Sequence, residues 1–431
     1  MKKFIYPIFV TALLVTLGFV YKKYDNQKNA VPNLRERATE ISSNSEWLNT
    51  KAAIETLVDK IRRNPNDAKA KIQLAMAYVQ ESRVSGDHAY YDESAMKLVE
   101  QVLAKEPTNF DGLCVKSTIL LSQHHFSDAL VVAKEVVSRY PASAFGYGLL
   151  CDANVELGNY PEAIQAADKM AGTRPDLRSY SRVAYLREIH GDYTGAKEAM
   201  KMATGAGVIG VEQTEWCRTQ LGKLYEATGD TANAAMQYNL TLSARPDYAY
   251  ALAGLGRLAK ISKQYTEGVA LLEIANKNVI DFSFNEELVD LYQLDNQPVK
   301  SKELAQKVLQ QLALHANTDA AEPDKGHYAD KELAYAYLKT GNVEKALEHA
   351  IREWNRRPEN IDVNECLAWV YFQKNDVPNA VKYIQKALKT NSQNSILLWR
   401  AGQIFIQNKE IEKGKSLENK ALQINKFLQT I

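Results

Sequence analysis

The sequence predicts an all-α solenoid, a stack of antiparallel helix pairs in which each pair packs on its neighbours. Three observations support this fold class: small residues recur mostly 33 or 34 residues apart, glycine or asparagine marks matched turns, and prolines end many of the repeats. A fixed period of this length is typical of repeat proteins, which need no single central core. The residues that set the period are Ala95, Ala129, Ala163, Ala196, Ala234, Gly268, Ser301, Ala346, Ala380 and Gly414.

The first element, residues 1–24, contains an apolar segment. Lys2 and Lys3 precede an uncharged run from Phe4 to Tyr21. As a helix this run would be about 27 Å long, close to the bilayer core of roughly 30 Å. A basic start followed by an apolar run is typical of an export signal. We therefore expect an export signal or a membrane anchor. Cleavage stays open, and so does orientation, because lysines flank both ends.

The next two elements lead into the repeats. Residues 25–44 are polar, which predicts an exposed linker. Residues 45–67 form an amphipathic pattern, with Trp47 and Ile54 among the apolar residues at helical spacing. The pattern stops before Pro65, because proline cannot continue a helix. We expect this helix to cap the N-terminal end of the stack as a half-unit.

Residues 68–281 are predicted to hold units 1–6, each with two helices. The first helix carries a small residue near its middle, and the second carries the residue of the series above. Close packing of antiparallel helices requires such positions, since a bulky side chain there would overpack the contact. Glycine or asparagine at the turn tolerates a left-handed backbone. The first-helix positions, units 7–10 included, are Ala75, Ser117, Cys151, Ala184, Gly222, Gly256, Val289, Ala334, Ala368 and Gly402.

The remaining elements depart from the regular pattern in places. Residues 82–89 look like an insertion between the helices of the first unit. Residues 282–326 are predicted to form a degenerate unit, with Pro298 at its turn, followed by an added loop; we expect a flexible joint there. Residues 327–431 complete the array as units 8–10 with a C-terminal cap.

The pattern resembles the tetratricopeptide repeat family. The segments LLCDANVELGNYPEAIQAADKM, from residue 149, and LAYAYLKTGNVEKALEHAIREW, from residue 333, show small, aromatic and turn positions in the family's order. The resemblance implies a right-handed α-solenoid of about ten units, longer than one superhelical turn, that binds a protein or peptide in its concave groove. The family's Asn and Lys/Arg clamp for a terminal carboxylate is not reproduced. Corresponding positions hold acidic residues: Asp111, Asp152, Asp290, Asp362 and Glu365.

The charge balance and the cysteines disfavour several classes of function. Lys and Arg total 53 against 52 Asp and Glu. Nucleic-acid binding usually requires a basic surplus, so we expect no nucleic-acid partner. The four cysteines include no CxxC pair, which gives no indication of a zinc site or a redox motif. We expect them to pack as small hydrophobic residues.

Two motifs have structural interpretations that we prefer. Residues 205–210 match GxGxxG, but a dinucleotide site needs a preceding strand, whereas this segment follows a helix. His124 and His125 are adjacent at a predicted turn, without carboxylates or cysteines at metal-ligand spacing, and we interpret them as a solvated turn. We expect no catalytic residue, cofactor or metal site.

Aromatic and basic residues on the exposed faces of the first helices are candidates for partner binding. Rings can bury apolar side chains of a bound peptide, while cations can meet its carboxylates. The alternative for each ring is packing between neighbouring units. The candidates are Trp216, Tyr250, Arg257, Lys260, Tyr328, Lys331, Tyr335, Trp369, Phe372 and Trp399.

Together these features favour a non-enzymatic scaffold that binds a partner protein or peptide in its concave groove. The alternative is a structural component of an envelope-associated assembly. The apolar segment predicts an exported or membrane-anchored protein of the cell envelope, on the periplasmic side of a bacterium. Membrane contact would run through residues 4–21 if they are retained. The sequence predicts neither the oligomeric state nor the identity of the partner.

Overall fold

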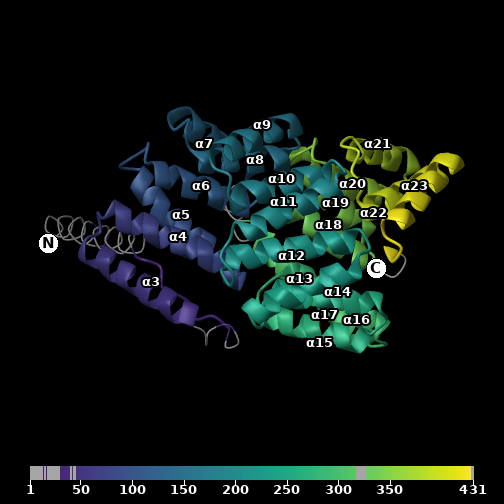
Figure 1. Cartoon of the computed structure of the whole chain (residues 1–431), viewed down its shortest axis with the longest axis horizontal. Helices are drawn as coiled ribbons and strands as arrows, with labels where there is room; N and C mark the ends of the chain where they lie inside the picture. The colour runs from purple at the N-terminus through teal and green to yellow at the C-terminus, as the bar shows by residue number, and fades with distance from the viewer. Residues whose placement is uncertain are drawn as a thin grey trace, which may run out of the picture.

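A computed structural model describes residues 13, 16, 30–38, 41, 45–316 and 327–428. Within these residues the chain forms α-helices joined by short turns, with no β-strand (Figure 1). Consecutive helices pair and stack along the chain, so the predicted all-α solenoid is confirmed. The half-unit α3 spans Ser45–Arg63.

In the described part of the chain, ten helix pairs follow α3, as the period of the small residues predicts. The first helices of the pairs are α4 (Ala68–Ser85), α6 (Phe110–Ser122), α8 (Ala144–Leu157), α10 (Leu177–Ile189), α12 (Glu212–Ala227), α14 (Ala249–Ile261), α16 (Phe282–Leu294), α18 (Asp330–Lys339), α20 (Ile361–Gln373) and α22 (Ser395–Gln407). The second helices are α5 (His88–Leu103), α7 (Phe126–Arg139), α9 (Tyr160–Thr173), α11 (Tyr193–Gly205), α13 (Thr231–Ala244), α15 (Tyr265–Asn278), α17 (Pro298–Ala316), α19 (Val343–Arg356), α21 (Val377–Ala387) and α23 (Ile411–Ile424).

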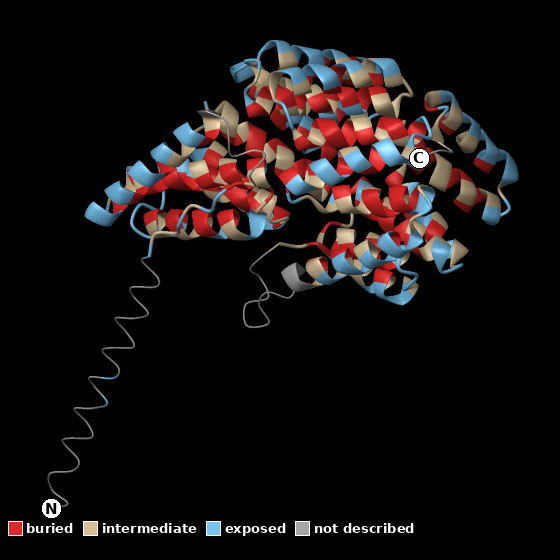
Figure 2. Ribbon diagram, turned by 90° about the horizontal axis from the view of Figure 1, so that it is seen from below, coloured by how far each residue is buried: buried red, intermediate tan, exposed pale blue. Residues whose placement is uncertain are grey.

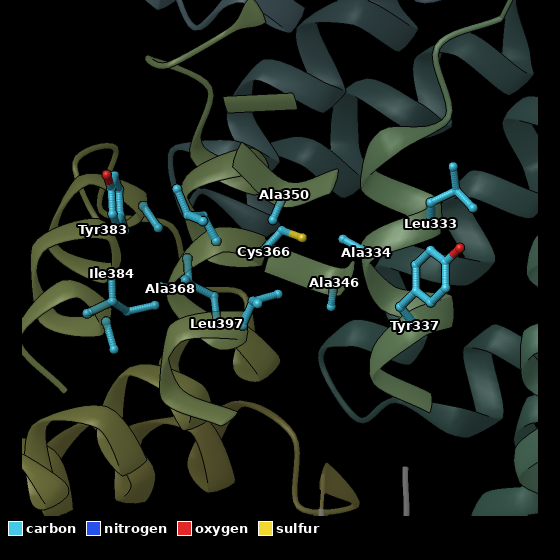
Figure 3. Packing of buried hydrophobic residues seen from close by; sticks show 14 of the residues in the cluster. Leu333, Ala334, Tyr337, Ala346, Ala350, Cys366, Ala368, Tyr383, Ile384 and Leu397 are labelled. Atoms are coloured by element: carbon cyan, nitrogen blue, oxygen red, sulfur yellow. The ribbon is translucent and has the colours of Figure 1, made fainter. Parts of the chain in front are cut away.

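The small residues lie where the two helices of a pair touch. The Ser117 hydroxyl donates to the carbonyl oxygen of Ala129 at 3.2 Å, which brings the two predicted positions of one unit together. In another unit, a methyl group added to Gly256 would stand 3.3 Å from the carbonyl oxygen of Gly268. Figure 3 shows the same arrangement in the C-terminal units, where buried Ala334, Ala346 and Ala368 leave room for larger neighbours such as Leu333 and Leu397. The predicted register is therefore confirmed.

Helix boundaries follow from prolines and capping side chains. Five of the second helices end a few residues before a proline, namely α5, α7, α9, α13 and α19. In several units a polar side chain then accepts a hydrogen bond from a backbone N–H in the first turn of the next helix. Asn109 caps α6 and Ser143 caps α8 in this way, while Asp176 forms a capping box with Ser179 on α10. These bonds satisfy N–H groups that have no partner inside the helix.

Two irregular segments differ from the sequence-based expectation. Residues 82–89 do not form a loop between helices, because α4 extends to Ser85 and α5 begins at His88. Residues 31–38 are not simply an exposed linker: the hydroxyl of Tyr78 donates to the carbonyl of Pro32 at 2.6 Å, and Arg37 is buried against Glu81. Residues 317–326, the added loop of the predicted joint, lie outside the described residues.

The predicted export or anchor segment also lies outside the described residues, apart from Leu13 and Thr16. Among the residues that the structure does describe, no helix combines the length and apolar character that a membrane span requires.

The array winds into a superhelix whose second turn packs directly on its first. Several contacts join residues 199 to 205 apart in sequence. That separation is about six repeats of roughly 34 residues. The turns inside units 1–5 meet the segments that precede the first helices of units 7–10 and the segment that follows α23. We call this set of contacts the inter-turn interface.

Backbone groups and ion pairs both contribute to the inter-turn interface. The N–H of Ile280 donates to the carbonyl of Ser85 at 3.0 Å, and the N–H of Ile361 donates to the hydroxyl of Tyr160 at 2.9 Å. Arg357 forms an ion pair with Glu156 at 2.5 Å. The amide of Asn425 donates to the carbonyl of Glu226 at 3.3 Å. The interface therefore runs along most of one superhelical turn.

A candidate partner-binding inner face

The first helices form the inner layer of the superhelix. Most successive first helices contact one another directly, from α4 with α6 to α20 with α22, as expected where curvature brings them together. Between α16 and α18, Lys339 bonds Asp290. Figure 1 places α10, α12 and α18 near the middle of the array and α7, α9, α15 and α23 near its rim. Buried residues run through the centre of the array, while exposed residues gather on the outer helices (Figure 2). We call the exposed side of the first helices the inner face.

Ion pairs between consecutive first helices run along the inner face. Each pair joins a carboxylate and a cation on neighbouring first helices, so much of the charge is neutralised within the protein. The pairs are Asp152–Arg182 at 2.5 Å, Glu226–Arg257 at 2.8 Å, Arg257–Glu287 at 3.1 Å, Asp290–Lys339 at 2.9 Å and Glu365–Arg400 at 2.9 Å. Arg257, which we predicted as a cation for a partner, is therefore paired with two glutamates and also bonds the Tyr238 hydroxyl.

The C-terminal units bring several predicted residues together in one cluster. Arg400 on α22 bonds the hydroxyl of Tyr335 at 3.1 Å, and its guanidinium lies over the ring of Trp369 at 5.0 Å. Phe372 stacks on Trp369 with ring centroids 4.9 Å apart. With Glu365 bonded to Arg400, three consecutive first helices contribute to one partly exposed group. We call these five residues the aromatic cluster.

On a second part of the inner face, charged side chains of the two superhelical turns lie near each other. Tyr185 and Glu188 on α10 lie in the electrostatic range of Asp362 on α20. Burial, with the nearby Asp362 carboxylate, raises the pKa of Glu188 to about 7, although Lys223 opposes the shift. The Tyr185 side chain keeps 39% of its surface exposed, yet surrounding protein raises its pKa well above the ordinary value. Side chains of the two superhelical turns therefore approach each other on the inner face.

The other predicted residues have varied surroundings. Trp216 packs against the core between α10 and α14, and Tyr250 makes an edge contact with Phe284 at 5.5 Å. For these two rings the structure shows the alternative of packing between units. Tyr328 lies in the inter-turn interface, where its ring stacks on His125 at 4.1 Å.

The remaining three predicted residues are also partly exposed. Lys331 lies near the carboxylates of Glu332 and Asp362, which outweigh burial and raise its pKa. Burial lowers the pKa of Lys260. Trp399 is half-buried on α22.

Sequence reasoning missed three features of this region. Arg400 was not predicted, although it organises the aromatic cluster, and Tyr185 was not recognised as exposed on the inner face. The inter-turn interface was missed too, and His124 and His125 do not form a solvated turn. His125 is buried, and His124 contacts Tyr328 across the interface. The glycines at the turns of the first units were the only sequence feature that could have indicated the inter-turn interface. The sequence does not show which segment packs against them.

The described residues give no indication of a metal centre or a reactive thiol. No group of three or more histidine, cysteine or carboxylate side chains in them is arranged to hold a metal ion. Cys114, Cys151, Cys217 and Cys366 are buried and unpaired, which agrees with the packing role predicted for Cys151. Burial raises the pKa of Cys366 to about 12, so its thiol stays protonated at neutral pH.

Comparison with known proteins finds solved structures with partial similarity to this chain. One is TTC0263, a thermophilic TPR protein of Thermus thermophilus, at 20% identity, covering 42% of this chain and 92% of that chain with a TM-score of 0.37. Another is the APC/C hetero-tetramer Cut9-Hcn1, at 14% identity, covering 88% of this chain and 60% of that chain with a TM-score of 0.44. No protein-family model matches the chain, and no curated protein sequence matches it.

The helix pairs of this chain, and not its superposition on these solved structures, define its structural class. It is an all-helical repeat solenoid of antiparallel helix pairs, wound so that one superhelical turn packs on the next.

Proposed function

We propose that the protein is a non-enzymatic scaffold that binds an extended segment of a partner protein on its inner face. The observation that carries this proposal is the aromatic cluster, in which Tyr335, Trp369 and Phe372 keep partly exposed rings beside Arg400. Rings of this kind offer large contact areas at a low entropy cost, and an adjacent guanidinium can bond a peptide carbonyl.

The ion pairs on the inner face limit which interactions a partner could form there. Because Arg257 and Arg400 already bond carboxylates of the inner face, a partner that relied on them would have to displace internal ion pairs. Removing one member of such a pair leaves the other without a partner, which is costly. Ring stacking and backbone hydrogen bonds are therefore the principal interactions in this proposal.

The proposal extends to location. A basic start and the apolar residues 4–21 support export or anchoring at the cell envelope, with the array on the periplasmic side of a bacterium. Fractionation of cells that express the full chain, followed by N-terminal sequencing of the mature protein, would test both points. Recovery of the intact chain in the cytosol would contradict them.

A capture experiment with matched variants tests the scaffold. The full chain serves as bait in an extract of its own cells, and Trp369→Ala is compared with Trp354→Ala, the same change on the outer helix α19. We expect the Trp369 variant to lose a partner that the Trp354 variant retains, at equal thermal stability. A partner that persists in fixed stoichiometry with both variants would contradict binding at the aromatic cluster and would favour the structural envelope component instead.

A further inference from the structure

Four of the seven histidines of the chain gather at one point of the inter-turn interface. They come from both superhelical turns: His88, His124 and His125 belong to the first, and His327, about 200 residues after His124, precedes α18 in the second. The rings of His124 and His327 have centroids 4.2 Å apart. We call His124, His125, His327 and Tyr328 the histidine contact.

Hydrogen bonds in the histidine contact place a hydrogen on Nδ1 of two rings. Nδ1 of His124 lies 2.8 Å from the carbonyl oxygen of Tyr328, and Nδ1 of His327 lies 3.2 Å from the carbonyl oxygen of Ser122. A carbonyl oxygen only accepts, so both Nδ1 atoms carry a hydrogen and donate it. Burial lowers the pKa of both rings, so at neutral pH Nε2 carries no hydrogen and a further proton would go there. The N–H of Tyr328 adds a third bond, to the carbonyl of Gln123 at 3.1 Å.

Charged groups from every neighbouring element face these rings. Around His124, burial, His327 and the cations Arg357 and Lys331 lower its pKa well below the ordinary value, against the bond to Tyr328. Around His327, burial and His88 lower the pKa, while Glu332 and Asp92 oppose the shift. Asp128 on α7 faces His125 at 3.8 Å, and Glu353 and Arg356 on α19 line the adjoining cavity of about 180 Å³.

We propose that the histidine contact is an acid-sensitive fastening that holds the start of α18 against the α6–α7 turn and releases it when His124 and His327 are protonated. Two cationic rings at van der Waals distance repel each other, beside two further cations, and separation of the turns relieves this repulsion and rehydrates both rings. Since α18 carries Lys331 and Tyr335, release would widen access to the inner face. The device depends on the interface alone and stands whatever partner the inner face binds.

The direction of the pH effect follows from linkage. A histidine whose pKa is lower in the closed form than in the exposed form stabilises the closed form above pH 6.5 and loses that contribution as the pH falls. For a ring with an ordinary pKa when exposed, the open population rises by at most roughly 30-fold per histidine between neutral pH and pH 5.0. We expect an increase of about tenfold or more for the two rings together.

Energy transfer between dyes on the two superhelical turns tests this proposal in the full chain. The dyes are attached at Val131→Cys on α7 and Arg352→Cys on α19, both exposed positions, while the native cysteines are buried. Between pH 7.5 and pH 5.0 we expect a loss of transfer efficiency with unchanged helical content. The double variant His124→Asn/His327→Gln should show no such loss, because neither side chain titrates and asparagine tolerates the left-handed backbone that His124 adopts, with φ of 63°.

Two further variants serve as controls for the loss of energy transfer. His190→Gln removes a histidine from another turn of the interface and should leave the pH response intact. If the double variant fails to fold, His327→Gln alone should reduce the response. A wild-type chain whose energy transfer does not change between pH 7.5 and pH 5.0, or a double variant that responds as the wild type does, would overturn the proposal.

Discussion

The turns of the first and second halves of the array have the same backbone conformation but different surroundings. In units 1–5 the turn residue with positive φ is glycine in four cases and His124 in the fifth, and these turns contact the second superhelical turn. In units 6–10 the corresponding residue is glycine only once, at Gly341. The other four are Lys263, Asn296, Asn375 and Lys409. Within the described residues these later turns make no hydrogen bond or ion pair to another superhelical turn.

Close approach explains the difference. A methyl group on Gly86 would overlap the carbonyl oxygen of Ile280, and one on Gly158 would overlap the backbone of Glu359. At Gly341 no atom lies within 4 Å of such a methyl group. A left-handed backbone alone therefore accepts asparagine or lysine, whereas one that lies as close to another chain segment as Gly86 or Gly158 does leaves no room for a side chain. The comparison shows that position in the superhelix, as well as local conformation, decides the residue.

The largest expected effect comes from a buried ion pair of the interface. Arg357 is 3% exposed and bonds both Glu156 and Glu353. Arg357→Ala should lower the free energy of unfolding by about 3–5 kcal/mol, because two carboxylates lose their buried partner. Urea denaturation measures this. The matched change Lys374→Ala, in the exposed pair with Glu344, should cost less than about 1 kcal/mol. Equal losses would show that the interface does not bury Arg357.

A smaller effect is expected from the glycine turns themselves. Gly158→Ala should cost about 3 kcal/mol, since the left-handed backbone penalty of about 1–2 kcal/mol adds to the displacement of Glu359. Gly341→Ala carries only the first of these costs. Thermal unfolding compares the two, and small-angle scattering should show expansion for the Gly158 variant alone. Similar losses without expansion would remove the distinction between the two sets of turns.

Packing within a unit should be separable from packing between superhelical turns. Ala380 is fully buried between α20 and α21, so Ala380→Leu should cost about 1–3 kcal/mol by overpacking. Its radius of gyration should stay that of the wild type. An unchanged melting temperature would count against the register of the small residues.

The smallest effect is expected at a turn without an inter-turn contact. Asn375 has φ of 62°; its backbone N–H donates to the carbonyl of Phe372 in the same turn, and its side chain accepts a hydrogen bond from Gln407 at 3.5 Å. Asn375→Gly should change the melting temperature by no more than a degree or two, because glycine removes a small strain and adds chain entropy in the unfolded state. A large loss would reveal a packing role for this turn.

Local features of the fold were predictable, and long-range ones were not. Spacing predicts the paired small positions, such as Ser117 and Ala129, because each pair packs within one unit. Helix ends follow from prolines and caps for the same reason. The inter-turn interface depends on the small rotation accumulated over six units, which no short segment encodes. That is why His124 and His125 were misinterpreted.

In the candidate site, too, local features were predictable and features that depend on several helices were not. Tyr335, Trp369 and Phe372 could be placed on one face by helical spacing, and the structure brings them together. Arg257 pairs with two glutamates from the first helices on either side, and this arrangement cannot be read from helical spacing. The prediction that Arg257 is available to a partner therefore did not include its internal ion pairs.

The central claim is that the second superhelical turn packs on the first, and hydrogen exchange of two amides tests it most directly. The N–H groups of Ile280 and Ile361 lie before or at the start of a helix, where no partner inside the helix is available, and their acceptors belong to the first superhelical turn. At neutral pH both amides should exchange far more slowly than amides of an unstructured peptide. Exchange at the unstructured rate, in a chain whose helix interiors remain protected, would show that the two turns do not meet.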